Sequence, residues 1–519
     1  MPPERAVTAQ ELVRRACETH ASRPLATVDG ETWTYGEAWE RGGRLAAAFD
    51  DRGLAAGDRV GLMMSNQLDY FTGLFACLRG GYAAVPMNDM LTAEEFEYML
   101  ANSGARGVLV GGGFTDTLAD VAPGTDLEVQ VAVEDPAGEQ VPLSDALGGT
   151  AVHDHPAGPG DLLMLPYTGG TTGRPKGVRH TQAGVAMAML AHVTELEIRD
   201  GEGMLFTTPL PHSAGYVAMS ALIQGAHFTV TAGFDAGEFL GLVDTEPVSW
   251  TFLVPTQIYR VLDHDDLAET DVSGLETVVY GAAPITPERL EEGLEVFGSV
   301  FIQLYGQTEM PDIGTILPKG DHVAGADQVG SCGKAAAMVD LRIANPEDSE
   351  DTDPLPAGEE GELLMRSPYV MERYHERPEA TAETLVDGWL RTGDIARMDE
   401  DGYVYLLDRA SDMVISGGMN VYTTEVEDAI DHHPGVAQVA VIGIPDDDWG
   451  EAVHAVVVPA GDADLTAEAV RETADEHLAD YKVPKSVEFV EEIPTTPYGK
   501  MDKKALRGPY WEDEDRGVS

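Results

Sequence analysis

Segments with helical and strand-like hydrophobic patterns alternate along the first four hundred residues of the chain. Apolar residues recur at helical spacing in RLAAAFDDRG (44–53) and FEYMLANSG (96–104), whereas RVGLMM (59–64) and GVLVGG (107–112) are short apolar runs of strand length. This alternation is typical of α/β layers. We therefore predict a large, multilayer α/β domain over residues 1–407.

The pattern changes near residue 408. Short strands are predicted in QVAVIGI (438–444), AVHAVVVPA (452–460) and SVEFVEEI (486–493), together with one long acidic helix, LTAEAVRETADEHLAD (465–480). These elements predict a small α+β domain over residues 408–519. The acidic stretch at 345–362 is predicted to be a solvated loop rather than a binding tail.

Acidic residues dominate the composition of the chain. Its 519 residues include 90 Asp and Glu against 33 Lys and Arg, which gives a formal net charge of -57. Such a surface repels nucleic-acid phosphates and anionic lipids, so neither is an expected partner. Only eight of the basic residues are lysines, a pattern that resembles proteins of salt-accumulating microbes. We hypothesise that the protein is halophilic, because multimolar salt screens charge repulsion over about 3 Å.

The cysteines and the apolar segments indicate where the protein works. Cys17, Cys77 and Cys332 are too widely spaced for a disulfide framework or a zinc site, which fits a reducing cytoplasm. The first residues lack the long apolar core of a secretory signal. Residues 214–233 are predicted to form a buried helix followed by a strand, not a membrane span. We expect a cytoplasmic protein without stable membrane insertion; a homodimer is compatible with the sequence, which leaves the oligomeric state open.

An apolar strand leads directly into a glycine-rich loop between residues 161 and 178. Glycines allow backbone N–H groups to close around a polyanion, hydroxyls add donors and a lysine adds charge, as a triphosphate requires. The loop differs from the Walker A pattern, in which Lys follows the last Gly. A flexible loop without a ligand is the alternative, and the length of the string disfavours it. The loop residues are Thr168, Gly169, Gly170, Thr171, Thr172, Gly173, Arg174, Pro175, Lys176 and Gly177.

The string YTGGTTGRPKGV resembles the signature loop of the adenylate-forming enzymes, the superfamily of acyl-CoA synthetases, adenylation domains and beetle luciferases. Further matches follow in the family's order: PLPHSAGY (209–216), YGAAP (280–284), YGQTEMP (305–311), GWLRTGD (388–394), DRASDMVISGGMNVY (408–422) and PTTPYGK (494–500). The resemblance spans nearly the whole chain. It implies an AMP-forming ligase that joins a small-molecule carboxylic acid to coenzyme A with ATP and Mg²⁺, and a large α/β domain followed by a mobile lid.

The motif YGQTE follows the apolar run SVFIQL (299–304). The end of a buried strand is thus expected to present Tyr305 as a flat surface for adenine and Glu309 as a hard oxygen ligand for Mg²⁺. Ligands collect at such strand ends in α/β sheets. By resemblance, Glu309 binds the metal together with Thr168. The resemblance also assigns nucleotide binding to Gly281, Ala282, Ala283, Pro284, Tyr305, Gly306, Gln307 and Thr308.

For two further side chains, Asp394 and His212, an ordinary structural role is an alternative to the functional role. Asp394 follows a glycine turn, where it either caps the turn or accepts hydrogen bonds from the ribose hydroxyls with support from Arg409. The resemblance favours the ribose. His212 on local sequence is most simply an ordinary loop histidine, and the resemblance assigns it to a gate between the acid pocket and the thiol channel.

Lysines concentrate near the C-terminus. Five of the eight fall within 23 residues, where even spacing would place fewer than one: Lys482, Lys485, Lys500, Lys503 and Lys504. We predict that this segment meets an anionic group. Docking on the acidic N-terminal domain is the alternative for Lys503 and Lys504. By resemblance, Lys500 bridges the carboxylate of the acid and the α-phosphate.

The resemblance implies two catalytic poses. Lys500, the glycine-rich loop and Mg²⁺ first offset charge on the α-phosphate while pyrophosphate leaves. The C-terminal domain then rotates about a hinge near Arg409, Ala410 and Ser411, so that Gly417 and Gly418 let pantetheine pass close to the backbone. The family usually has Asp or Lys where this chain has Ser411, so the hinge position rests on alignment.

Two other functions remain open on sequence alone. One is a stand-alone adenylation enzyme that loads a carrier protein, and the other is a nucleotide-binding regulator without catalysis. The acid pocket is expected around residues 214–218, Ala282, Met310 and Pro311, which suggests a mainly apolar acyl or aryl group. The sequence does not indicate the chain length of the acid.

Overall fold

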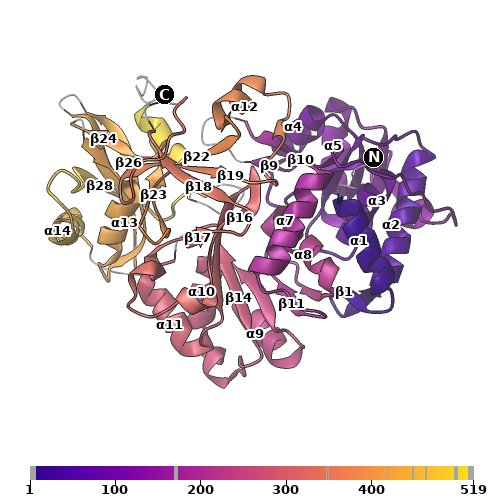
Figure 1. Cartoon of the computed structure of the whole chain (residues 1–519), viewed down its shortest axis with the longest axis horizontal. Helices are drawn as coiled ribbons and strands as arrows, with labels where there is room; N and C mark the ends of the chain where they lie inside the picture. Colours follow the sequence, from indigo (N-terminus) through magenta and orange to yellow (C-terminus); the bar gives the residue numbers. More distant parts are fainter. Residues whose placement is uncertain are drawn as a thin grey trace. The chain divides into compact units, whose positions relative to one another are not determined.

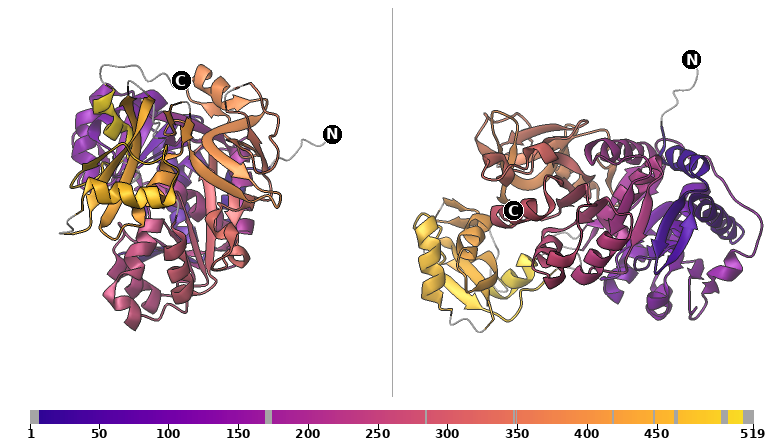
Figure 2. Two further views of the ribbon diagram at one scale, coloured as in Figure 1. Left: turned by 90° about the vertical axis from the view of Figure 1, so that its left-hand side faces the viewer. Right: turned by 90° about the horizontal axis from the view of Figure 1, so that it is seen from below.

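The computed structural model describes residues 7–168, 174–283, 285–346, 348, 350–417, 419–446, 449–461, 465–495 and 501–511. It divides into two compact units. The first comprises residues 1–168, 175–341 and 365–390, and the second comprises residues 169–174, 342–364 and 391–519. Both combine helices and strands (Figures 1 and 2). The predicted fold class, a large N-terminal α/β part with a smaller C-terminal part, is confirmed.

One nine-stranded sheet forms half of the first unit. Its strands run in the order β17-β16-β15-β14-β13-β11-β12-β1-β2, with parallel pairing from β15 to β1 and antiparallel strands at both edges. The strands are β1 (Pro24–Val28), β2 (Glu31–Thr34), β11 (Gly203–Phe206), β12 (His227–Val230), β13 (Trp250–Leu253), β14 (Thr277–Gly281), β15 (Phe301–Gln307), β16 (Met310–Leu317) and β17 (Lys334–Ala335).

A second nine-stranded sheet forms the other half of this unit. Its order is β20-β10-β8-β4-β3-β5-β6-β7, and β9 also pairs with β10. The strands from β8 to β7 are parallel, whereas β10 is antiparallel to its neighbours. The strands are β3 (Arg59–Met63), β4 (Ala83–Met87), β5 (Ala105–Val110), β6 (Val129–Ala132), β7 (Val141–Pro142), β8 (Leu162–Met164), β9 (Tyr167–Thr168), β10 (Lys176–Thr181) and β20 (Arg373–Tyr374).

Helix α3 lies inside the first unit. Every residue from Tyr70 to Gly80 is buried, as expected for a helix that is covered all round. It contacts β3 and β4 of the second sheet, and its Phe71 ring stacks on Phe228 of β12 in the first sheet at 5.7 Å. The helices of this unit are α1 (Ala9–Thr19), α2 (Tyr35–Asp50), α3 (Asp69–Gly80), α4 (Ala93–Ser103), α5 (Thr115–Val121), α6 (Leu143–Ala146), α7 (Gln182–Glu195), α8 (Gly215–Ala221), α9 (Ala236–Thr245), α10 (Pro255–Leu262), α11 (Pro287–Phe297) and α12 (Pro378–Thr384).

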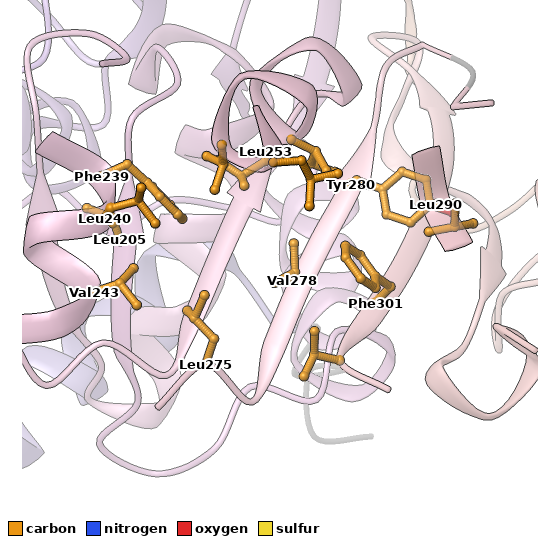
Figure 3. Close-up of a cluster of buried hydrophobic side chains, with 14 of the residues drawn as sticks. Leu205, Phe239, Leu240, Val243, Leu253, Leu275, Val278, Tyr280, Leu290 and Phe301 are labelled. Carbon is orange, nitrogen blue, oxygen red and sulfur yellow. The ribbon is translucent and has the colours of Figure 1, made fainter. Parts of the chain in front are cut away.

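The outer face of the first sheet carries its own apolar core. Side chains from the strands and from the covering helices meet there, including Val278 and Tyr280 of β14, Phe301 of β15 and Leu290 of α11 (Figure 3). All four are at most 2% exposed. This layer fixes β14 and β15, the strands that precede two of the predicted nucleotide-binding segments.

Two five-stranded sheets occupy the later part of the chain. The first has the order β18-β19-β22-β21, with β23 antiparallel to β22, and the second has the order β25-β24-β27-β26, with β28 parallel to β27. Helices α13 (Thr423–Asp431) and α14 (Ala467–His477) contact each other, and both contribute to a valine-rich core with the five-stranded sheet that contains β26 and β27. The strands are β18 (Asp340–Ala344), β19 (Glu360–Arg366), β21 (Leu385–Val386), β22 (Trp389–Met398), β23 (Val404–Arg409), β24 (Val414–Ser416), β25 (Met419–Val421), β26 (Val436–Asp446), β27 (Gly450–Pro459) and β28 (Ser486–Phe489); the short helix α15 is Lys503–Arg507.

The acidic stretch at 345–362 is only partly the predicted loop. Strand β19 begins at Glu360, and Glu362 is 7% exposed. Its carboxylate accepts a 2.9 Å hydrogen bond from Nε of Arg391, which is also buried. The prediction of a solvated stretch was therefore wrong at this end, because a cation from a later strand compensates the charge. The helix and strand predicted within residues 214–233 are present as α8 and β12, and no helix in the described ranges is long and apolar enough to cross a membrane.

Candidate functional site

Asn66 joins loops at the carboxyl ends of the two large sheets. Its side chain is 6% exposed and lies just after β3. The amide nitrogen donates to the carbonyl oxygens of Thr208 and Thr231, both at 3.0 Å, and the amide oxygen accepts from the Leu210 N–H at 2.7 Å. Because those loops follow β11 and β12, the carboxyl ends of the two sheets face each other. Ligands of open α/β sheets bind at this edge.

The base of the glycine-rich loop is a hairpin at this edge. Thr168 of β9 pairs with Lys176 of β10, which holds the two ends of the loop together. The Lys176 ammonium lies 4.3 Å from the ring centroid of Tyr374, a favourable cation–π contact. Five of the predicted loop residues, Gly169, Gly170, Thr171, Thr172 and Gly173, lie outside the described residues.

Glu309 occupies the two-residue turn between β15 and β16. The residue is 9% exposed. Its Oε1 accepts a hydrogen bond from the Tyr374 hydroxyl at 2.5 Å, and its backbone oxygen accepts from the Met371 N–H at 2.7 Å. Burial, followed by the charge of Glu309, raises the pKa of Tyr374, so the phenol keeps its proton and acts as the donor. The turn thus holds a buried carboxylate in a fixed direction.

His180 supports the same turn from β10. One of its ring nitrogens, Nε2, lies 2.8 Å from the carbonyl oxygen of Thr308. A carbonyl only accepts hydrogen bonds, so Nε2 carries the proton and donates. Burial lowers the pKa of His180 to about 4, which keeps the ring neutral near pH 7. The His180 ring also meets the ring of Tyr216 edge-on at 6.0 Å.

The predicted adenine-binding residues lie on β14, on β15 and directly after them. Tyr305 is half-buried within β15, two residues before the strand ends. The expected place of Tyr305 near the end of a strand is thus present, and the strand continues to Gln307 because β16 pairs back along it. An added Cβ would lie 2.5 Å from the Leu304 oxygen at Gly281 and 2.4 Å from the Asp312 backbone at Gly306, so neither position accepts a side chain without a shift.

The remaining residues of these two segments differ in backbone conformation and exposure. Ala282 is exposed with a φ of +68°, in the left-handed region that alanine rarely adopts. Ala283 is also exposed, and Gln307 and Thr308 are half-buried. Pro284 lies outside the described residues. The segments therefore present backbone and partly accessible side chains at the carboxyl edge of the first sheet.

His212 lies in an irregular turn, Leu210–Ala214, directly before α8. Its backbone φ and ψ of -119° and -154° interrupt the helical path, and the side chain is half-buried. The next residue, Ser213, donates to Oδ1 of Asp312 on β16 at 2.9 Å. The turn is thus connected to the strand that follows Glu309.

The second unit brings Asp394 and Arg409 together. They are cross-strand neighbours on β22 and β23, and Nε of Arg409 lies 3.3 Å from Oδ1 of Asp394. The Asp394 side chain is 10% exposed and that of Arg409 is 45% exposed. The predicted pairing of these two residues is present in the structure. A buried carboxylate oriented by an arginine is suited to accept hydrogen bonds from hydroxyl groups.

Of the three residues predicted beyond β23, the structure describes Gly417. Gly417 has a φ of +60°, and an added Cβ would lie 2.4 Å from the Trp449 ring. Gly418 and Lys500 lie outside the described residues. Thr495 and Met501, the described residues on either side of 496–500, form an isolated antiparallel bridge.

Two of the lysines near the C-terminus contact acids of their own unit. Lys503 forms an ion pair with Glu427 at 2.7 Å and donates to the Thr423 hydroxyl at 2.7 Å, and Lys482 pairs with Glu425. Docking of Lys503 and Lys504 on the N-terminal domain stays an alternative, and Lys503 has an acidic partner within its own unit. Its partner is a buried carboxylate on α13, which no local sequence pattern reveals.

A cavity of about 770 Å³ opens at the opposite ends of the strands. Its lining includes Arg59, Gly81, Gly104 and Leu162, which lie at or just before the start of β3, β4, β5 and β8. Nucleotide sites form at the carboxyl ends of such strands. The cavity is therefore not the candidate site.

Asn66, His180 and Tyr374 are the described residues that sequence analysis missed. Each acts by holding a motif residue through a contact that spans more than 60 positions of the chain. Asn66 gave one local signal, a polar residue at the end of an apolar strand. Tyr374 gave none, because its role depends on two partners from other strands.

Comparison with known proteins finds two family models along the chain. The family model described as AMP-binding enzyme matches residues 13–375, and the model of the AMP-binding enzyme C-terminal domain matches residues 425–500. A feruloyl-CoA synthase of Amycolatopsis sp is 38% identical over 480 residues, which cover 92% of this chain and 94% of that protein.

Two further relatives extend this likeness. The medium/long-chain-fatty-acid–CoA ligase FadD8 of Mycobacterium tuberculosis is 34% identical over 530 residues, which cover 97% of this chain and 90% of that protein. The crystal structure of ATP-bound MatB from Rhodopseudomonas palustris is similar with a TM-score of 0.88 at 31% identity, covering 97% of this chain and 99% of that one.

Proposed function

The chain belongs to the family of AMP-binding enzymes and is an AMP-forming acyl-CoA synthetase, and we propose from this premise how its own residues divide the reaction. The first step joins a carboxylic acid to AMP and releases pyrophosphate. The second step transfers the acyl group from AMP to the thiol of coenzyme A. The observation that carries the assignment is Tyr374, which contacts both Lys176 of the glycine-rich hairpin and the buried carboxylate of Glu309.

The reaction makes a strong electrostatic demand in its first step. A carboxylate is a weak nucleophile and the triphosphate repels it, so cationic groups and N–H donors have to offset charge on the phosphates. We assign phosphate binding to Thr168, residues 169–173 and Lys176, and adenine binding to Tyr305 with residues 281–284. The Asp394–Arg409 pair is assigned to the ribose hydroxyls. Lys500 is assigned to the α-phosphate and the acid carboxylate.

Glu309 fits a magnesium ion that is bound mainly by the nucleotide. Within the described residues no group of three or more potential ligands occurs, whereas Mg²⁺ commonly takes one or two carboxylates together with substrate phosphates. Tyr374 holds one oxygen of the carboxylate, which directs the group, and Thr168 supplies a hydroxyl at the hairpin base. When bound, Mg²⁺ neutralises phosphate charge. Glu309 and Thr168 are the residues that would hold it.

The second step is proposed to use rotation of residues 408–519 about Ser411. In support, the backbone around this residue is anchored to the C-terminal helix α15: Nη1 of Arg507 donates to the Ser411 oxygen at 2.8 Å and lies 3.0 Å from the Asp412 carboxylate. This anchoring would carry the segment and helix α15 as one body. The rotation brings Gly417 and Gly418 to the thiol, where the absence of a Cβ leaves room for pantetheine.

The compartment and the salt requirement are proposed from the cysteines and the net charge. All three cysteines are buried and free, as expected in a reducing cytoplasm. A homodimer stays a prediction. The net charge of -57 supports a halophilic protein that requires salt. Retention of fold and activity in dilute buffer would remove that part of the proposal.

The test is a panel of carboxylic acids assayed for pyrophosphate and for acyl-CoA, with and without CoA, in high KCl. We expect acid-dependent pyrophosphate release and a CoA thioester. Release without a thioester from any acid would favour the carrier-protein acceptor. Absence of release with every acid would instead favour a regulator without catalysis.

Two variants separate the assigned roles. Glu309→Gln should lower adenylation about 100-fold, as loss of an oriented charge-stabilising group does, whereas the exposed Glu139→Gln serves as the matched control. Lys500→Ala should abolish adenylation and spare acyl transfer from supplied acyl-adenylate, with the exposed Lys504→Ala as control. Equal loss of both steps in Lys500→Ala would contradict the two-pose mechanism.

A further inference from the structure

Two backbone contacts join the described residues before and after the segment that carries Lys500. Thr495 and Met501 form the isolated antiparallel bridge, and the Asp502 N–H donates to the Pro494 oxygen at 2.8 Å. Asp502 is also the N-cap of the short helix α15. A movement of α15 would therefore move both flanks of the segment that carries Lys500.

Lys503, the first residue of α15, has two side-chain partners on α13. Its ammonium group lies 2.7 Å from Oε1 of Glu427 and donates to the Thr423 hydroxyl at 2.7 Å. The side chains of Lys503 and Glu427 are 11% and 12% exposed, and Thr423 is fully buried. The same oxygen of Glu427 accepts from the Val441 N–H at 2.7 Å, which fixes the carboxylate. The start of α15 is thus bonded to a site formed by α13 and β26.

The Thr423 hydroxyl connects this site to the segment in which the hinge is proposed. It accepts from Lys503 and donates to Oδ2 of Asp408 at 2.9 Å, and the Thr423 N–H donates to the same oxygen at 2.5 Å. At the other end of α15, Arg507 donates to the Ser411 oxygen at 2.8 Å. Both ends of α15 are therefore connected to the hinge segment, one of them through Thr423.

The buried pair between Lys503 and Glu427 is suited to fixing the position of α15. This helix has 5 residues, too few for stability on its own, so its position depends on such contacts. A buried ion pair often adds no net stability over an apolar pair, because both charges leave water. It does fix geometry, since moving either partner away leaves the other charge buried and unpaired. Burial raises the pKa of Glu427 to about 7, with Lys503 opposing the shift, so the pair is charged at pH 8.

We propose that Lys503 is a positioning residue for the first step of the reaction: its bonds to Glu427 and Thr423 hold α15, and with it the flanks of Lys500, where adenylation requires them. This inference rests on the proposed function, which assigns Lys500 to the α-phosphate and the acid carboxylate. A displacement of about 1 Å in a catalytic group costs about 100-fold in rate. Loss of the anchor should therefore appear as a loss of adenylation.

Lys503→Met tests this role through the two half-reactions, in high KCl at pH 8. ATP–pyrophosphate exchange should fall about 100-fold in kcat with little change in the KM for ATP, because Lys500 acts on charge that develops in the transition state. Acyl transfer from supplied acyl-adenylate to CoA should be nearly unchanged. Equal losses in both steps, or no loss of exchange, would overturn the proposal.

Lys482→Met is the matched control. Lys482 also forms an ion pair with a glutamate of α13, Glu425, but it lies between α14 and β28 and not on α15. Its replacement removes a lysine from the same helix surface and should leave ATP–pyrophosphate exchange near the native rate. A loss of exchange equal to that in Lys503→Met would show that the effect does not depend on α15, and the proposal would be wrong.

Glu427→Met combined with Lys503→Met separates stability from position. An apolar pair often restores the stability that a broken buried ion pair loses, so this double variant should melt near the native temperature. It lacks the directional bonds of the ammonium group, so exchange should stay at least about 10-fold below the native rate. Recovery of exchange together with the melting temperature would show that the pair only stabilises the fold.

Hydrogen exchange measures the anchor without turnover. The Asp502 amide, which donates to Pro494, should exchange faster in Lys503→Met and at the native rate in Lys482→Met. An unchanged rate in Lys503→Met would mean that the flanks of Lys500 are held without this lysine, against the proposal. The proposed function fails separately, if the native protein releases no pyrophosphate with any acid.

Discussion

Replacing Asn66 with alanine tests how the two large sheets hold their shared edge. The side chain makes three hydrogen bonds to the backbone, at 3.0, 3.0 and 2.7 Å, and is 6% exposed. A buried hydrogen bond contributes about 0.5–1.5 kcal/mol net. Loss of all three therefore predicts a decrease of about 3 kcal/mol in the free energy of unfolding. The substitution also leaves two carbonyl oxygens and one N–H group without partners, so little of this loss is recovered.

Asn66→Asp separates shape from hydrogen bonding. Its carboxylate keeps an acceptor for Leu210 N–H and places negative charge against the carbonyl oxygens of Thr208 and Thr231. We expect it to be at least as destabilising as Asn66→Ala, although its volume is almost unchanged. Both variants should also lower kcat/KM, because the turn with His212 begins at Leu210.

Denaturant unfolding followed by circular dichroism measures the effect, with an unchanged dependence on denaturant as the check for a simple transition. The neighbouring, half-buried Ser65→Ala is the control and should change the free energy by less than about 0.5 kcal/mol. A decrease below about 1 kcal/mol for Asn66→Ala would refute the reasoning, since it would mean that the sheet edges are held without this side chain.

Three other predictions follow from buried contacts. Tyr374→Phe should slow adenylation about 10-fold by releasing Glu309, measured by ATP–pyrophosphate exchange; an unchanged rate would contradict its positioning role. Burial raises the pKa of Glu427 from 4.5 to about 7, with Lys503 opposing the shift, so its contribution to stability falls as pH rises between those values. Lys503→Met should consequently cost about 3 kcal/mol at pH 8 and much less at pH 6, where the carboxyl keeps its proton; a loss independent of pH in denaturant unfolding would argue against this. Burial lowers the pKa of His180 from 6.5 to about 4, so the stability that the neutral ring contributes is intact above pH 6.5 and is lost as pH falls toward 4. His180→Gln should therefore make the free energy of unfolding less dependent on pH over that interval. An unchanged pH dependence would show that His180 does not cause it.

Regular elements were predictable where their patterns are local. FEYMLANSG and GVLVGG form α4 and β5, and the strands predicted at 438–444 and 452–460 are the antiparallel pair β26 and β27. Hydrophobic periodicity identifies such segments because the burial of one face of a helix or strand, or of both faces, determines where its apolar residues fall. Tyr305 shows the limit of this approach. The extent of β15 is set by pairing with β16, and cross-strand pairing leaves no trace in a single apolar run.

The candidate site was predictable as a set of motifs and not as an assembled structure. Glu309 stands in a recognisable string, whereas its partner Tyr374 lies 65 positions away on an edge strand. The Asp394–Arg409 pair was accessible because both members stand in motifs, and these motifs fall on adjacent strands. Partners that lie in unremarkable sequence, such as Glu427 for Lys503, become visible only when the backbone brings them together.

Exposed charges and buried charges contribute differently to the stability of this acidic protein, and added salt should distinguish the two contributions. The net charge is -57, and most acidic side chains in the described part of the chain are not buried, so ions screen their repulsion over about 3 Å at 1 M salt. The Lys503–Glu427 pair is different, since both side chains are at most 12% exposed and little screening reaches them. Raising KCl should therefore stabilise the native protein by several kcal/mol while the difference between native and Lys503→Met stays constant. A difference that shrinks in parallel with added salt would show that the pair is open to solvent and that its burial does not set its strength.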